Sequence, residues 1–258
     1  MRKGLYFLTS IISVVMMIGF SIGIAQAGPC ELPVFDVNNF DTSPQSTTYS
    51  ANITNPYLPL MPGTVFEYEP VPNDENVVDT MIVTSTIKTI TVDGDSIDCL
   101  QVHDFETVDG VLSEDTLDWY AQDFEGNVWY CGEDTTEYLE GGGIDKSGSW
   151  EAGKDVAGLG VVALPGYVML ASQKSGECYQ QESYPSEAED KAKIMRLNAK
   201  VELDNGNSYV DCLETKEWSP LELGAIEQKI YAKGVGLVLN FEHHGKHVRN
   251  ELVSVTSP

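Results

Sequence analysis

The feature that most constrains the fold is a series of β-branched and aromatic runs separated by short turns rich in Asp, Asn and Gly. The run Met81–Val92 ends at Asp93-Gly94, which supplies a tight hairpin turn, and a second run returns over Ser96–Phe105. Asp109-Gly110 repeats this device before Val111–Gln122. Closely spaced runs of this kind favour antiparallel pairing of chain neighbours. We predict an all-β protein, an antiparallel meander that forms a sandwich or a half-barrel.

The later part of the chain continues the pattern with one interruption. Ser208–Trp218 follows a polar turn, and Val235–Glu242 with Val248–Val255 predicts a half-buried edge hairpin. Ser186-Glu187-Ala188-Glu189 has the spacing of a capping box, in which Glu189 follows the Ser186 cap by three residues. We therefore expect one short helix from Ser186 to about Met195.

The N-terminus has the organisation of an export signal. Arg2 and Lys3 precede an apolar stretch over Ile11–Ile24, and Ala25-Gln26-Ala27 gives a small-residue cleavage pattern. We predict a signal peptide over residues 1–27, cleaved near Ala27, a loosely structured segment over 28–55 and a single β-rich domain over 56–258. The mature protein is then secreted or periplasmic. No later apolar run reaches the roughly 18 residues that a transmembrane helix needs.

The charge of the chain excludes some partners. It has 15 Lys and Arg against 40 Asp and Glu, and removal of residues 1–27 leaves a net charge of −27. A phosphate backbone requires a basic face, so nucleic-acid binding is excluded. The charge also attracts cations. Acidic turns such as Asp123–Asn127 offer oxygen ligands for calcium, but none has the EF-hand spacing. Asp, Asn and Gly are also the residues that ordinary turns favour, which is the first interpretation of these segments.

An aromatic block is the first candidate site. Trp119-Tyr120 and Trp129-Tyr130 flank the turn Asp123–Asn127, and Glu133-Asp134 follows directly. If these runs pair as a hairpin, aromatic rings occupy both of its faces. One face would be core and the other would line a pocket for a sugar ring or an apolar ligand. A carboxylate pair beside aromatic rings also suggests a glycoside hydrolase, whose chemistry requires a definite separation of the two carboxyl groups.

A histidine-rich turn is the second candidate site. His243, His244 and His247 are three of the four histidines in the chain. Neutral imidazoles bind zinc or copper, and acidic surroundings concentrate cations. Adjacent residues of a strand point to opposite faces, however, so His243 and His244 do not readily share an ion. A solvated polar turn is the alternative interpretation.

Several phrases of the chain together resemble a family of exported bacterial proteins without an assigned function. The resemblance covers about residues 55 to 240. It is carried by Asn55–Thr64, Asp118–Asp123, Gly126–Tyr130, Gly132–Thr135, Ser149–Gly153, Glu187–Asp190, Thr215–Glu222, Tyr231-Ala232 and Gly234–Val238. It implies no activity, cofactor or catalytic residue. Cysteine at positions 131 and 178 departs from that family, which implies a Cys131–Cys178 disulfide, a second disulfide between Cys30 and Cys99, and a free Cys212.

The sequence therefore favours an exported, non-catalytic binding protein of the cell envelope, whose ligand is apolar, sugar-like or another envelope protein. A metal-binding protein that uses the histidine hairpin with calcium, zinc or copper is one alternative. A hydrolase with Glu133 and Asp134 as an acidic pair is another. No G-x-S-x-G, H-E-x-x-H or phosphate-binding loop occurs in the chain, which disfavours an enzyme.

Overall fold

The computed structural model describes residues 30–139, 141–243 and 247–258. The predicted signal peptide therefore lies outside the described residues. Within them the chain forms a 15-stranded antiparallel sheet and one short 3-10 helix, η1 (Val37–Asn39). The strands are β1 (Val65–Val71), β2 (Val77–Val92), β3 (Asp95–Val108), β4 (Val111–Gln122), β5 (Val128–Tyr138), β6 (Ile144–Asp145), β7 (Trp150–Glu151), β8 (Leu164–Met169), β9 (Cys178–Gln180), β10 (Glu182–Ser183), β11 (Lys191–Glu202), β12 (Ser208–Trp218), β13 (Glu227–Ala232), β14 (Gly236–Glu242) and β15 (Arg249–Thr256).

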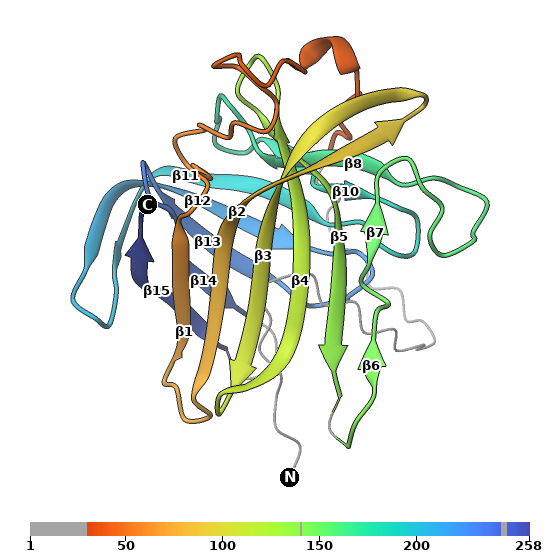
Figure 1. The fold of residues 1–258 in the computed structure, drawn as a ribbon. Coiled ribbons are helices and arrows are strands. Elements are labelled where there is room, and N and C mark those ends of the chain that lie inside the picture. The colour runs from red at the N-terminus through yellow and green to blue at the C-terminus, as the bar shows by residue number, and fades with distance from the viewer. Residues whose placement is uncertain (1–29, 140, 244–246) are drawn as a thin grey trace, which may run out of the picture.

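The sheet curls until its two ends nearly meet. Its strand order is β10-β8-β5-β4-β3-β2-β1-β15-β14-β13-β12-β11-β9, so the path begins and ends with two strands that are consecutive in the chain. In Figure 1 the strands β1–β5 form the wall nearest the viewer and β11–β15 form the wall behind it. The predicted all-β antiparallel architecture is confirmed. Within the described residues, no helix has the length and apolar character needed to cross a membrane.

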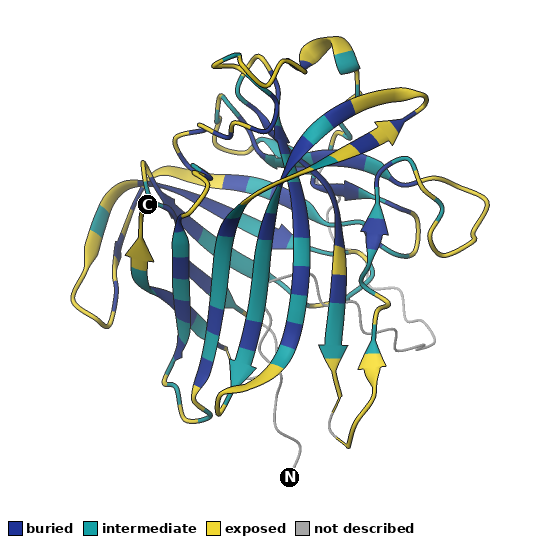
Figure 2. Ribbon diagram, in the orientation of Figure 1, coloured by how far each residue is buried: buried dark blue, intermediate teal, exposed yellow. Residues whose placement is uncertain are grey.

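The predicted Asp-Gly turns build the front wall. Asp93 and Gly94 have φ of 53° and 93°, and Asp109 and Gly110 have φ of 52° and 74°. Positive φ at both central residues matches the right-handed twist of the flanking strands, which makes such turns favourable in hairpins. They join β2 to β3 and β3 to β4 in a meander. Buried and partly exposed residues then alternate along these strands (Figure 2).

The first core lies between the two walls. On the front wall it includes Phe66, Val83 and Val102, and on the back wall Leu213 and Val238. All five are at most 3% exposed. Alternation places each of these side chains on the inner face of its strand. This core occupies one end of the inner face, and the residues farther along the same strands are polar.

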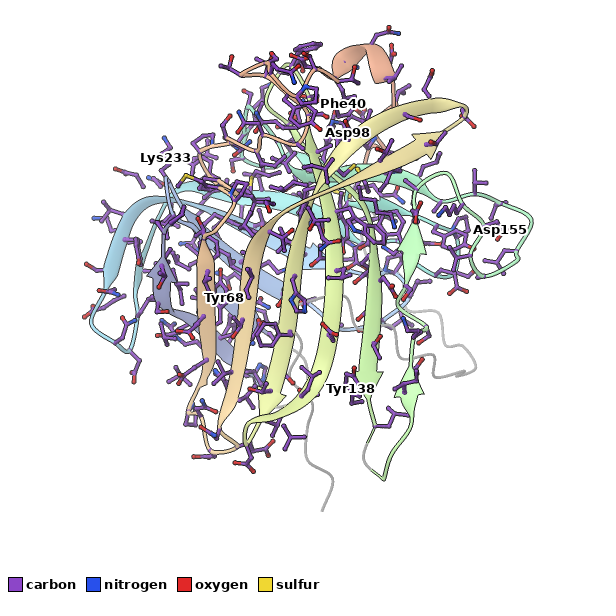
Figure 3. All side chains as sticks on the ribbon, in the orientation of Figure 1. Phe40, Tyr68, Asp98, Tyr138, Asp155 and Lys233 are labelled. Atoms are coloured by element: carbon purple, nitrogen blue, oxygen red, sulfur yellow. A yellow bond between two sulfur atoms is a disulfide. The ribbon has the colours of Figure 1, made fainter. Side chains whose placement is uncertain are left out.

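A second core lies on the outer face of β3, β4 and β5. Trp119 and Trp129 are 4% and 1% exposed there, and Phe40 from the N-terminal segment packs on Trp129 with ring centroids 5.6 Å apart. The N-terminal segment is fixed at this end because Tyr49 donates a hydrogen bond of 2.9 Å to Asp98 on β3. Figure 3 shows Phe40 and Asp98 at the same end of the molecule.

Two sequence-based expectations are wrong. The segment Ser186–Met195 is not a helix: Ser186 has φ 67° and the chain enters β11 at Lys191. The capping contact itself forms, because the Ser186 N–H donates to Glu189 at 2.9 Å, but it closes a turn. Ala192 and Ile194 then alternate as buried residues of a strand.

The predicted edge position of the closing hairpin is the second wrong expectation. Each of its strands, β14 and β15, has a partner on both sides.

The disulfide pairing implied by the family resemblance is also wrong. Cys30 bonds Cys178. The reason is local: Glu31 forms a parallel bridge with Tyr179, which sets the two cysteines beside each other with Cα atoms 4.8 Å apart. Cys99 and Cys131 are buried and unbonded in this structure, so neither takes its expected partner. The expectation that Cys212 is free is confirmed.

Candidate functional site: an acidic face inside the curled sheet

The polar end of the inner face is made of carboxylates because they occupy alternate positions of neighbouring strands. On β4 the residues Glu114 and Asp118 share one side, and the register places Glu106 opposite Glu114 and Glu133 opposite Asp118. Like charges directly opposite each other destabilise a strand pair. We call the following set the acidic face: Asp79, Asp104, Glu106, Glu114, Asp118, Glu133, Glu182, Asp190, Glu217, Glu227 and Glu242, together with Lys229.

The acidic face spans both walls of the sheet. Glu242 on β14 raises the pKa of Glu106 on β3, although the two strands are not sheet neighbours. Burial raises the pKa of Asp104 on β3 and of Glu182 on β10 well above the usual values, and the charge of Lys229 on β13 opposes both shifts. The alternation of side chains along each strand is consistent with this, because it puts these residues on the inner faces of the two walls.

One part of the acidic face is fully satisfied. Lys229 lies 3.0 Å from Glu217 and 3.0 Å from Glu227. Glu217 also accepts hydrogen bonds from Thr215 at 2.7 Å and from Gln181 at 3.2 Å. Burial by itself would raise the pKa of Glu217, but Lys229 and these donors hold it below its usual value. This part is a buried, ionised and hydrogen-bonded group, as buried charges require.

Another part of the acidic face is not satisfied. Among the described residues, Glu133 Oε1 and Glu182 Oε2 are buried without a hydrogen-bond partner, and these residues are 2% and 3% exposed. Both amide atoms of Asn240, which lies opposite Lys229, are also without a partner, as are the Nε1 atoms of Trp119 and Trp150 in the second core. A buried polar atom without a partner costs about 1–3 kcal/mol, and more where it is charged. Native structures contain few such atoms, so a group of them on one face points to a missing partner.

The carboxyl groups around these atoms hold their protons strongly. Burial raises the pKa of Glu133 well above its usual value, and the nearby Asp118 and Glu182 raise it further. Burial also raises the pKa of Asp118 well above its usual value, and the charge of Asp104 raises it further. A hydrogen bond of 2.5 Å from the Tyr130 hydroxyl opposes this shift. A carboxyl group of this kind is either protonated near neutral pH or stabilised by a bound cation.

Four further carboxyl groups titrate close to neutral pH. Burial raises the pKa of Asp79 to about 7 against an opposing hydrogen bond with Asp104, and raises that of Asp190 to about 6. Burial likewise raises the pKa of Glu106 to about 8 and that of Glu242 to about 8. The acidic face therefore exchanges several protons over a narrow range of pH.

The structure separates the predicted aromatic and carboxylate residues into two groups. Tyr120 and Tyr130 stack with ring centroids 5.1 Å apart, and Tyr130 donates to Asp118, so this pair borders the acidic face together with Glu133. Trp119 and Trp129 belong to the second core on the outer face. Asp134 is exposed and pairs with Lys146 at 2.7 Å. Glu133 and Asp134 therefore do not face one common site.

The predicted histidine site lies only partly within the described residues. His243 is exposed, lies 3.4 Å from the Gln228 amide oxygen and has its ring centroid 6.3 Å from that of His247. His244 lies outside the described residues. Over residues 30–139, 141–243 and 247–258, no group of three or more His, Cys, Asp or Glu residues has an arrangement that could hold a metal ion.

A depression of about 300 Å³ lies elsewhere, beside the outer side of β1. Its polar groups bond one another: Asn73 donates to Glu69 at 3.2 Å, and the Asp204 N–H donates to Glu251 at 2.5 Å. Because its polar groups are already paired, this depression is a weaker candidate than the acidic face.

Sequence reasoning missed most of the acidic face. Asp118 carried a usable signal, since Glu114, Thr116 and Asp118 recur at every second position of a predicted strand and so share one face. Glu182 and Lys229 carried none, because they join the face only when β10 and β13 are brought against β3–β5 by the curl of the sheet.

Comparison with known proteins gives distant structural likeness only. No protein-family model and no curated protein matches the chain. An exported protein from Bacteroides fragilis, described as having a YmcC-like fold, is 11% identical, with a TM-score of 0.41 over 79% of this chain and 100% of its own. A structure from Parabacteroides distasonis, described as a lipoprotein, is 10% identical, with a TM-score of 0.37 over 78% of this chain and 98% of its own.

Proposed function

We propose that the protein is an exported, non-catalytic binding protein of the cell envelope, and that its ligand is an organic polycation held on the acidic face. One observation carries this proposal: Glu133 Oε1 and Glu182 Oε2 are buried without hydrogen-bond partners among the described residues. An ammonium group has three donors and a positive charge, so it satisfies such oxygens and offsets their mutual repulsion.

The spread of the carboxyl groups favours an extended ligand over a single ion. They lie on both walls, and the described residues contain no set with the convergence that a metal ion needs. Neighbouring strands are about 4.8 Å apart, and side chains on one face of a strand repeat every ~6.6 Å. A linear polyamine, with ammonium groups separated by short alkyl spacers, matches this pattern of spaced carboxylates. Tyr120 and Tyr130 supply aromatic surface beside Asp118 for the alkyl chain or for a cation.

The electrostatics of the whole chain support the same ligand class. A mature net charge of −27 attracts cations and speeds their encounter with the protein. Lys229 shows how a cation is accommodated on this face, because its ammonium group sits between Glu217 and Glu227 and keeps Glu217 ionised. An ammonium group of the proposed ligand would pair with Glu133 and Glu182 and keep them ionised, as Lys229 does for Glu217.

Isothermal titration calorimetry with spermidine at pH 8 tests this proposal. The double variant Glu133→Gln/Glu182→Gln removes the two unpartnered carboxylates. The control Glu125→Gln/Asp134→Asn removes the same number of carboxyl groups, at exposed positions. We expect about a 10- to 100-fold loss of affinity for the first variant, since a hydrogen bond to a charged group contributes about 1.5–3 kcal/mol. The control should bind as the wild type does.

Other outcomes would replace the proposal. Equal losses in the two variants would mean diffuse attraction by the overall charge. No heat with spermidine would remove polyamines as the ligand class. Native mass spectrometry of the exported protein before and after chelation covers the alternatives: a metal increment lost on chelation would favour the metal-binding interpretation, and a retained uncharged organic mass would favour an apolar or sugar-like ligand.

A further inference from the structure

Cys99 and Cys131 meet although their strands are not neighbours in the sheet. Cys99 lies on β3 and Cys131 on β5, with β4 between them. In Figure 1 the far end of the β2–β3 hairpin crosses over β4 and β5. The crossing is fixed by an ion pair of 2.9 Å between Lys88 on β2 and Glu151 on β7, a strand that pairs with β5. The hairpin end is thus folded onto the outer face of β5.

Small residues allow the close approach at this crossing. Ala121 on β4 lies opposite Trp129 in the register of the sheet and has only a methyl group there. Gly153, with φ 80°, passes so near β2 that a Cβ at this position would lie 1.9 Å from the Thr91 carbonyl oxygen. The second core therefore closes tightly around the two sulfur atoms.

The two thiols face each other in this core. Both cysteines are 0% exposed and belong to the same apolar cluster. The Cys99 thiol forms a hydrogen bond with Cys131. Burial raises the pKa of Cys99 well above its usual value, and this hydrogen bond raises it further. In the folded protein Cys99 is a poor nucleophile that solvent does not reach.

We propose that Cys99 and Cys131 form a second disulfide in the exported protein, linking the β2–β3 hairpin to β5 across β4. Disulfides persist in the oxidising environment that an exported protein enters, and the chain already has one, Cys30–Cys178. The oxidant is the disulfide of an exported thiol oxidoreductase. One cysteine thiolate attacks that disulfide and releases one of its thiols. The second cysteine thiolate then attacks the mixed disulfide, forms the Cys99–Cys131 bond and releases the other thiol.

This chemistry requires the Cys99–Cys131 bond to form before the β2–β3 hairpin packs onto β5. The net reaction converts two thiols and one oxidoreductase disulfide into one protein disulfide and two oxidoreductase thiols, so sulfur, hydrogen and electrons balance. Attack needs an accessible thiolate, which the folded core does not offer. The bond therefore forms while β2–β3 is still open, and the second core then covers it.

Intact mass spectrometry after alkylation tests the proposal. Protein secreted to an oxidising compartment is unfolded in guanidinium with iodoacetamide and without reductant. Two disulfides leave Cys212 as the single alkylated cysteine and a mass four hydrogens below that of the reduced chain. Three alkylated cysteines and a deficit of two hydrogens would overturn the proposal. So would a peptide map that joins Cys99 or Cys131 to any other cysteine.

Matched variants assign the signal. Cys212→Ser should show no alkylated cysteine, and Cys131→Ser should show two, at Cys99 and Cys212. Cys131→Ser showing no alkylated cysteine would mean that Cys99 pairs with Cys212 and would also overturn the proposal. The measurement on the wild-type chain is decisive even where a variant fails to fold, because it requires no variant.

Discussion

Asp118 and Glu133 lie directly opposite each other on β4 and β5, and both are at most 2% exposed. Only one of them is stabilised by a described donor, since Tyr130 donates to Asp118 while Glu133 Oε1 has no partner among the described residues. Two carboxyl groups placed in this way cannot both ionise without a cation nearby. The pair links the fold of the front wall to the proposed ligand.

Neutralising one member of this pair should stabilise the empty protein at alkaline pH. In Asp118→Asn the amide oxygen still accepts from Tyr130, but the side chain has no proton to lose on unfolding. We expect Tm at pH 8 to rise by at least about 3 °C, because 1 kcal/mol shifts Tm by roughly 2–4 °C in a chain of this size. The gain should shrink at pH 4, where the carboxyl group is protonated in the folded state and about half protonated in the unfolded chain. Thermal unfolding followed by circular dichroism measures the change in Tm, and Glu125→Gln is the control at an exposed position. An unchanged or lower Tm of Asp118→Asn at pH 8 contradicts the prediction.

The stability of the wild-type chain should fall as pH rises from 5 to 8.5. In the folded state the pKa values of Asp190, Asp79, Glu106 and Glu242 are raised to about 6, 7, 8 and 8. The unfolded chain loses these protons near pH 4, so the folded state binds more protons over this window and the free energy of unfolding decreases with pH. Urea unfolding at both pH values checks the sign. Equal or greater stability at pH 8.5 would show that a cation already neutralises the acidic face.

Removing Lys229 should destabilise the fold strongly. Lys229→Met keeps much of the alkyl chain but leaves the buried Glu217 without its ion-pair partner. Breaking a buried pair in this way costs about 3–5 kcal/mol. Lys200→Met, at an exposed position of β11, should change stability by no more than about 0.5 kcal/mol. Urea unfolding at pH 7 compares the two variants, and similar small changes in both would show that Glu217 readily takes up a proton instead.

Two glycines of the same region should respond very differently to alanine. Gly153 has φ 80°, and an added Cβ would lie 1.9 Å from the Thr91 carbonyl oxygen, whereas Gly158 has φ 73° and no atom within 4 Å of that position. Gly158→Ala should therefore cost only backbone strain, of the order of 1 kcal/mol. Gly153→Ala must also push β2 away from the loop after β7, so we expect a loss of at least ~3 kcal/mol or failure to fold. Equal costs would mean that the hairpin does not cross here.

The strands could be predicted from the sequence because their signals are local. Alternating β-branched residues and Asp-Gly turns act within a few residues, and β2, β3 and β4 follow them. The capping box at Ser186–Glu189 was equally local, yet its hydrogen bond suits a turn as well as a helix, and the pairing of β11 with β9 and β12 decided the outcome.

The candidate site could be predicted only in part. Tyr120, Tyr130 and Glu133 were found because they follow one another in the chain, but the direction of each side chain depends on which face of β4 and β5 becomes the interior. Both faces of β4 carry buried residues, with Asp118 on one side and Trp119 on the other, so composition does not decide between them. The effect of Lys229 on the pKa of Asp104 depends on the curl of the whole sheet, because β13 and β3 are far apart in the strand order.

Spermidine binding should weaken as pH falls. At pH 6 several carboxyl groups of the acidic face carry protons that an ammonium ligand must displace, whereas at pH 8.5 more of them are ionised. The primary amines of the ligand stay protonated at both pH values, as the usual lysine pKa of about 10.4 indicates. We expect at least a 10-fold lower affinity at pH 6, with protons released on binding. Calorimetry in two buffers of different ionisation enthalpy counts those protons. Binding without proton release, or with equal affinity at both pH values, would place spermidine on the exposed acidic surface instead of the buried face.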